Sequence, residues 1–173
     1  RHPAAKSDAE LDLNYMKRVE KNDPVAMTQM GIMRYDEGDY SSAFEYLTKA
    51  AELGDVKAHY KLADMYYHGR GVEKDEKKEV YHLEEAAIGG HVDARHNLGC
   101  HEANNGRMER AVKHFTIAAN MGEEESMKAL WHCHARGLVK KEQLTATLRA
   151  HQTAVCETKS QQREKAEEFL RRN

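Results

Sequence analysis

Ala58-His59-Tyr60-Lys61-Leu62-Ala63 is the stretch that decides the fold of this 173-residue chain, because its pattern returns three more times. The other copies are Ala26 to Gly31, Ala94 to Gly99 and Ser126 to Trp131, and the steps between successive copies are 32, 36 and 32 residues. A pattern that recurs at such a period indicates an array of structural repeats.

A second motif follows the first three copies at a fixed distance. It reads Ala-Ala-Glu-Leu-Gly at Ala50 to Gly54, and it returns at Ala86 to Gly90 and at Ala118 to Gly122. Glycine at these positions is typical of a helix end. Each repeat is therefore expected to contain two short helices and a stop. Such a unit cannot bury its apolar face alone, so we expect it to stack on its neighbours and to present a long surface.

We expect one all-α helical-repeat domain over residues 1–173. An entry helix is predicted at 8–22, repeats at 23–54, 55–90, 91–122 and 123–157, and a polar capping helix at 160–173. The segment Asn22-Asp23-Pro24 is typical of a helix start, with a capping side chain before a proline in the first turn. Four extra residues at Gly69 to Val72 explain the step of 36, and Lys141 to Val155 is predicted as the second helix of repeat four.

Small and large apolar residues alternate in a way that predicts the core. The small ones are expected where paired helices approach closely, and the large ones are expected to fill the space between repeat units. The first set is Ala51, Ala58, Ala87, Ala94 and Ala119, and the second is Leu62, Leu83, Leu98, Phe115 and Leu130.

Composition narrows the classes of function. Lys and Arg number 27 against 29 Asp and Glu, and both signs are mixed along the chain, which disfavours binding to a phosphate backbone. No run of apolar residues is long enough for a membrane helix, so no membrane partner is expected. Three cysteines without Cys-x-x-Cys spacing favour a reducing compartment, and we expect the cytoplasm or the nucleus.

Repeat two carries a closer resemblance. Its Ala-x-x-x-Leu-x-x-x-Tyr, Gly-x-Gly-Val-x-x-Asp and Ala-Ala-x-x-Gly-His patterns resemble Sel1-like repeats (SLR), a branch of the tetratricopeptide-repeat superfamily. The matching residues are Ala58, Leu62, Tyr66, Gly69, Gly71, Val72, Asp75, Ala86, Ala87, Gly90 and His91. Repeats one and three lack the glycine-rich turn, and Gly38 to Ala43 resembles the shorter turn of tetratricopeptide repeats. The resemblance covers residues 23 to about 157. It implies a right-handed α-α superhelix of about four helix-turn-helix repeats with capping helices at both ends.

The whole chain also resembles algal proteins in which such repeats follow a RING-type zinc finger, with Arg1-His2-Pro3 falling just after the finger. This resemblance implies that the parent protein is a ubiquitin ligase whose repeats select the target.

The family resemblance implies a non-catalytic adaptor that binds a partner peptide or helix in a concave groove lined by the first helix of each repeat. Tyrosines would supply contact area, and Lys128 with Arg136 would hold an acidic group. The alternative is that some of the tyrosines only fill the seam between repeats. The groove residues carried over by alignment are Thr28, Ile32, Tyr35, Asp36, Lys57, Tyr60, Asp64, Tyr67, His68, His96, Cys100, Asn104, Lys128, His132 and Arg136.

Two other interpretations belong to different classes of protein. A hydrolase on a repeat scaffold would need a nucleophile with a positioned base, an orienting partner and an oxyanion donor, and none of these three can be nominated for Cys100 beside His96. An RNA-binding helical repeat would be basic, whereas this chain is slightly acidic. Structural zinc would need a fourth ligand that the sequence does not offer. We therefore expect a monomer without catalytic residues, metal or cofactor, whose partner is a protein or peptide and not a nucleic acid.

Overall fold

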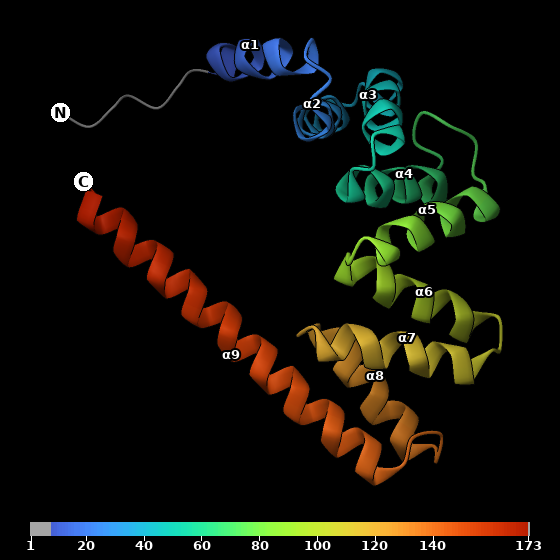
Figure 1. Cartoon of the computed structure of the whole chain (residues 1–173). Coiled ribbons are helices and arrows are strands. Elements are labelled where there is room, and N and C mark those ends of the chain that lie inside the picture. The colour runs from blue at the N-terminus through green and yellow to red at the C-terminus, as the bar shows by residue number, and fades with distance from the viewer. Residues whose placement is uncertain (1–7, 173) are drawn as a thin grey trace. The chain divides into compact units, whose positions relative to one another are not determined.

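The structure, a computed structural model, describes residues 8–172 and the side chains of residues 13–171. The predicted junction at Arg1-His2-Pro3 lies outside these residues. The described part of the chain forms nine helices and no strand (Figure 1). They are α1 (Asp8–Val19), α2 (Pro24–Asp36), α3 (Tyr40–Glu52), α4 (Val56–His68), α5 (Glu76–Ile88), α6 (Val92–Asn104), α7 (Met108–Asn120), α8 (Glu124–Ala135) and α9 (Lys141–Arg172).

The helices belong to two compact units. The N-terminal unit ends at His91 and the C-terminal unit begins at Val92. In the N-terminal unit α2 pairs with α3 and α4 with α5, while α1 packs on α2 and α3 on α4. In the C-terminal unit α6 pairs with α7, and α9 packs on both α7 and α8. The prediction of an all-α fold made of consecutive helix pairs is therefore confirmed. In the described part of the chain, no helix combines the length and the apolar character needed to cross a membrane.

Local signals place the helix boundaries. Asp23 accepts hydrogen bonds from the backbone N–H groups of Val25 and Ala26, at 3.0 and 3.2 Å, and Pro24 opens α2 as predicted. The entry helix ends earlier than predicted, at Val19, because Asn22 takes a left-handed φ of 58° and turns the chain before this cap.

The predicted core residues are buried. The five alanines expected at close helix approaches are 0–7% exposed, and the five large residues expected between repeat units are 1–4% exposed. In the N-terminal unit the core runs through α2, α3 and α4, from Met27 to Met65. In the C-terminal unit it runs through α7, α8 and the first turn of α9, from Ala111 to Leu144.

The C-terminal segment differs from the prediction. The sequence predicts one helix over 141–155 and a separate capping helix over 160–173, whereas α9 is continuous from Lys141 to Arg172. No glycine or proline interrupts this stretch. The Thr158 hydroxyl donates to the Ala154 carbonyl at 3.0 Å, so this polar residue also continues the helix.

The last helix pair also packs differently from the first and third. In those pairs a glycine allows close approach, since a methyl group at Gly31 would lie 2.7 Å from Leu47 Cγ and one at Gly99 would lie 2.6 Å from Phe115 Cε1. Trp131 has the same register position in α8, and its side chain is 50% exposed. The bulk of an indole does not fit beneath a crossing helix, and α9 instead reaches α7, where His151 Nδ1 lies 3.0 Å from the Ala119 carbonyl oxygen.

Candidate functional site

A polar network joins predicted groove residues of the N-terminal unit. The Tyr35 hydroxyl donates to Asp64 Oδ2 at 2.6 Å, and His68 Nε2 lies 3.3 Å from Asp64 Oδ1. The Arg70 guanidinium donates to the Tyr35 hydroxyl and lies 3.9 Å from Asp64 Oδ2. Burial, followed by the bond to Asp64, raises the pKa of Tyr35 above its usual value, so its phenol stays a neutral donor. The network therefore fixes the C-terminal ends of α2 and α4 relative to each other.

The remaining predicted residues of this unit differ in accessibility. Tyr67 is 60% exposed and its ring meets the His68 ring edge-on at a centroid distance of 4.8 Å. Asp36 and Lys57 are exposed, whereas Ile32 is half-buried. Tyr67 therefore offers the largest accessible ring among the predicted groove residues.

Three predicted residues share one register position and one structural role. Thr28, Tyr60 and His96 each contact the residue three positions before the next copy of the repeated pattern. Thr28 Oγ1 donates to Asp55 Oδ1 at 2.9 Å, the Tyr60 ring stacks on His91 at 4.1 Å, and His96 Nδ1 lies 3.3 Å from Glu123 Oε2. Thr28 is only 1% exposed. It therefore holds the N-terminal cap of α4 and is not accessible to a partner.

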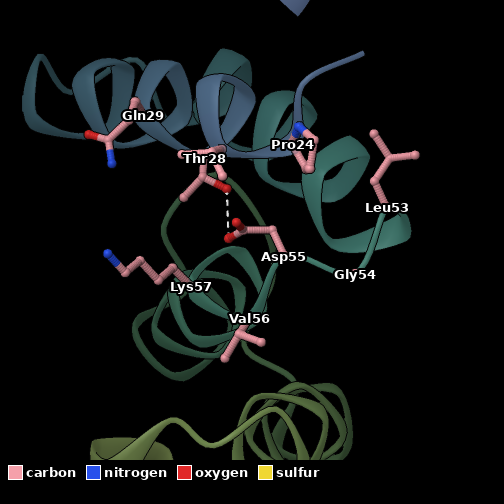
Figure 2. Close-up of a pocket in the computed structure, with 9 residues that line it drawn as sticks. Pro24, Thr28, Gln29, Leu53, Gly54, Asp55, Val56 and Lys57 are labelled. Carbon is pink, nitrogen blue, oxygen red and sulfur yellow. Dashed lines mark hydrogen bonds between the residues drawn. The ribbon is translucent and has the colours of Figure 1, made fainter.

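A cavity of about 340 Å³ opens beside Thr28, between the starts of α2 and α4 and the end of α3 (Figure 2). Val25 and Leu53 line it and are each 51% exposed. Figure 2 shows the side chains of Gln29 and Lys57 on the side of the cavity opposite Leu53. The sequence did not predict this cavity; its full lining is Pro24, Val25, Thr28, Gln29, Leu53, Gly54, Asp55, Val56 and Lys57.

In the C-terminal unit, His96 lies between a thiol and a carboxylate. Its Nε2 is 3.4 Å from Cys100 Sγ, and its Nδ1 is 2.8 Å from Ser126 Oγ as well as near Glu123. Glu123 thus supplies an orienting partner that the sequence did not reveal. Burial, followed by the charge of Glu123, raises the pKa of the Cys100 thiol. An activated nucleophile needs a lowered pKa, so this environment disfavours the hydrolase interpretation.

No cluster of three His, Cys, Asp or Glu side chains suited to a metal ion occurs among the described residues. The three cysteines are all free: Cys133 is buried, Cys100 is half-buried and Cys156 is exposed. The raised pKa of Cys133, which burial causes, marks it as a packing residue.

The other predicted groove residues of this unit, Asn104, Lys128, His132 and Arg136, are exposed. Lys128 Nζ lies 2.8 Å from Glu125 Oε1, and this hydrogen bond raises the pKa of Lys128. Sequence reasoning missed Trp131 on the same helix, half of whose side chain is accessible. The available signal was that a tryptophan stands where two of the other copies have glycine and one has alanine.

A histidine pair lies within the α4–α5 hairpin. His59 Nδ1 and His82 Nδ1 are 3.0 Å apart, so one ring donates to the other, and the His82 ring stacks on Tyr66 at 5.6 Å. Burial, the neighbouring His59 and the charge of Lys78 lower the pKa of His82 to about 4. Below pH 6.5 the unfolded chain therefore takes up a proton that the folded chain excludes.

The free energy of unfolding is accordingly expected to fall between pH 6.5 and pH 4, by about 2 kcal/mol from this group after allowance for partial exposure. Above pH 6.5 both states are neutral at this position and the contribution vanishes. Urea unfolding at pH 7 and pH 4.5 checks the effect, with His82→Phe as the variant that retains an aromatic ring. A variant with the same loss of stability at pH 4.5 as the wild type would contradict this assignment.

Family matching agrees with the repeat geometry. Residues 24–55, 56–91 and 92–123 each match the Sel1 repeat. The chain belongs to the Sel1 repeat family. The matched segments begin one residue after the predicted repeat boundaries, and they end before α8 and α9, where the packing departs from that of the earlier pairs.

Three relatives illustrate the likeness. The rat protein DAP3-binding cell death enhancer 1 is 26% identical over 168 residues, which cover 74% of this chain and 33% of that protein. A Sel1 repeat protein from Oxalobacter formigenes has a TM-score of 0.69 at 25% identity, covering 80% of this chain and 61% of the other. A protective antigen of uropathogenic Escherichia coli with an SLR fold has a TM-score of 0.67 at 25% identity, covering 81% and 32%. The chain thus spans about a third of the length of its curated rat relative.

Membership of this family indicates a general role. Sel1 repeat proteins generally mediate protein–protein interaction, and their scaffold is generally non-catalytic. The findings do not support the finer resemblance to algal RING-finger proteins.

Proposed function

We propose that this Sel1 repeat chain is a non-catalytic adaptor that holds a polypeptide partner along the first helices of its repeats. The observation that carries the proposal is Tyr67, an aromatic side chain that is 60% exposed at the end of α4. An exposed ring of this kind supplies a large contact area at a low entropic cost. It lies beside His68, which contacts the Asp64 carboxylate of the rigid network, so the ring has a fixed neighbour.

Two further observations support a protein partner. Trp131 is also half exposed on the first helix of its pair, in the C-terminal unit. Tyrosine and tryptophan are the residues most enriched among those that dominate binding energy at protein interfaces. The rat relative is named as a DAP3-binding protein, which favours protein binding for a chain that is 26% identical to it over 168 residues.

The test uses affinity capture with the full chain as bait. Tyr67→Ala is expected to lower the amount of captured partner by about tenfold, since a central aromatic residue contributes a large share of interface energy. Tyr81→Ala is the matched control, because Tyr81 is 53% exposed but lies on α5, a second helix. Recovery of the same partners in the same amounts with Tyr67→Ala, or an equal loss with Tyr81→Ala, would overturn the proposal.

The ubiquitin-ligase context of the parent protein stays a prediction of the sequence, as does a cytoplasmic or nuclear location. A ubiquitylation assay with the parent protein would test the first, and fluorescence microscopy of the tagged protein would test the second.

A further inference from the structure

The loop at Gly54, which lines the cavity beside Thr28, corresponds to the loop at Gly122 in the C-terminal unit. The two glycines have the same register position in their repeats. A methyl group at Gly122 would lie 3.5 Å from Ala154 Cβ and 3.6 Å from Val155 Cγ2, both on α9. A methyl group at Gly54 would meet no atom within 4 Å. A helix therefore covers the loop at Gly122, whereas the loops at Gly54 and at Gly90, which has the same register position, are open among the described residues.

The helix that covers Gly122 also makes a polar contact with its loop. His151, one turn before Ala154 in α9, places Nε2 3.4 Å from Glu124 Oε2. Glu124 and Glu125 occupy the register positions of Val56 and Lys57 in the open loop. An imidazole thus lies beside an acidic side chain in the C-terminal unit, whereas the open loop has Val56 and Lys57 at the two corresponding positions.

The open loop at Gly54 presents an exposed apolar surface against which a helix can pack. Leu53 and Val25 border the cavity and expose half of their side-chain surface. Lys57 is exposed and forms no ion pair within the part of the chain that the structure describes. Asp55 also lines the cavity, but its Oδ1 already accepts from Thr28 Oγ1 and from the Ala58 N–H at 2.8 Å. Lys57 is therefore the more exposed of the two charged side chains that line the cavity, since Asp55 is half-buried.

We propose that the cavity at Gly54 receives an α-helix of a partner protein, as α9 is received at Gly122. The helix places a small side chain over Gly54, an aliphatic side chain against Leu53 and Val25, and an acidic side chain near Lys57. Exclusion of water from Leu53 and Val25 supplies the affinity, and Lys57 supplies the charge preference. This inference rests on the proposed adaptor function and names the chemistry of the segment that is bound.

The test is a fluorescence-anisotropy titration of the full chain with two labelled peptides. Each has about 16 residues, long enough to form a helix, with alanine and leucine on one stripe. One peptide carries glutamates beside the stripe and its twin carries lysines. The glutamate peptide is expected to bind about tenfold more tightly than its twin, and Lys57→Glu is expected to reverse the preference.

Leu53→Glu is expected to lower the affinity for the glutamate peptide by about tenfold. The control is Ile88→Glu, at a 76% exposed apolar position outside the cavity, which is expected to leave the affinity within about twofold.

Equal affinities for the two peptides, or an unchanged preference in Lys57→Glu, would overturn the inference. A wild-type dimer in light scattering that Leu53→Glu dissociates would also overturn it, because a second copy would then fill the cavity. The two proposals fail separately. Partner capture that depends on Tyr67 but not on Lys57 or Leu53 would refute the cavity and keep the adaptor. Capture insensitive to Tyr67 together with peptide binding at the cavity would overturn the proposed function on the first helices and keep the cavity.

Discussion

Replacement of Gly71 by alanine is expected to lower the free energy of unfolding by about 4 kcal/mol. Gly71 has a φ of 72°, in the left-handed region that costs other residues about 1–2 kcal/mol. Its Cα also faces the start of α3 so closely that a methyl group would lie 2.7 Å from the Tyr40 carbonyl oxygen and 2.9 Å from the Tyr40 carbonyl carbon. Backbone atoms cannot move aside as a flexible side chain can, so the loop or the helix start must shift.

The matched control is Gly38→Ala. Gly38 has a similar φ of 84°, but a methyl group there would meet no atom within 4 Å. We expect this variant to lose only about 1–2 kcal/mol, the conformational cost alone. Chemical denaturation of both variants measures the difference. Equal losses would mean that the contact with Tyr40 contributes nothing.

The same substitution has a consequence for the polar network. Gly69 and Gly71 are the left-handed residues on either side of Arg70, and this loop geometry carries the guanidinium to Tyr35 and Asp64. A shift of the loop would withdraw Arg70 and leave the Tyr35–Asp64 bond without its cation. The glycine-rich turn of repeat two therefore positions the charged side chain of Arg70.

Gly99→Val is expected to lower the free energy of unfolding by about 3 kcal/mol, because it overpacks the α6–α7 crossing. The new Cβ would lie 2.6 Å from Phe115 Cε1 and 2.7 Å from Phe115 Cδ1, and Phe115 is itself only 4% exposed. The ring is thus enclosed by neighbouring residues and not by solvent. The hairpin must then open or the ring must leave its rotamer.

A double-mutant cycle with Phe115→Leu tests this cause. The second substitution alone should cost about 1.5 kcal/mol, and independent effects would add to about 4.5 kcal/mol. We expect the double variant to lose only about 2–3 kcal/mol, because the smaller side chain makes room for the valine. Additive losses measured by urea unfolding would show that Gly99 is needed for another reason.

The helix boundaries were largely predictable because their signals are local. Asp23 and Pro24 mark the start of α2 as expected, and α5 begins at Glu76 after the lengthened turn. The main error, a predicted break in α9, arose where the sequence holds neither glycine nor proline. The threonine hydroxyl of Thr158 bonds to a carbonyl of its own helix and so continues it.

The candidate site was less predictable because exposure depends on residues from another repeat. Thr28 and Tyr67 both lie on the predicted groove face, yet one is 1% exposed and the other 60%. Asp55, 27 positions along the chain, accepts the hydrogen bond of the buried Thr28 hydroxyl, whereas the exposed Tyr67 ring meets its chain neighbour His68. Helical periodicity gives the direction of a side chain and not what lies opposite it.

The sequence by itself determined the repeat array, the helix starts and the buried alanine and leucine positions, because caps, glycines and apolar spacing act within one helix pair. The tertiary structure alone decided three further features: the open cavity at Gly54, the covered loop at Gly122 and the exposure of Trp131. Each of these features depends on the path of a neighbouring helix. The example is α9, which takes a different path from the second helices of the other pairs. Packing between elements, and not the pattern within them, therefore sets which surface this repeat protein offers to a partner.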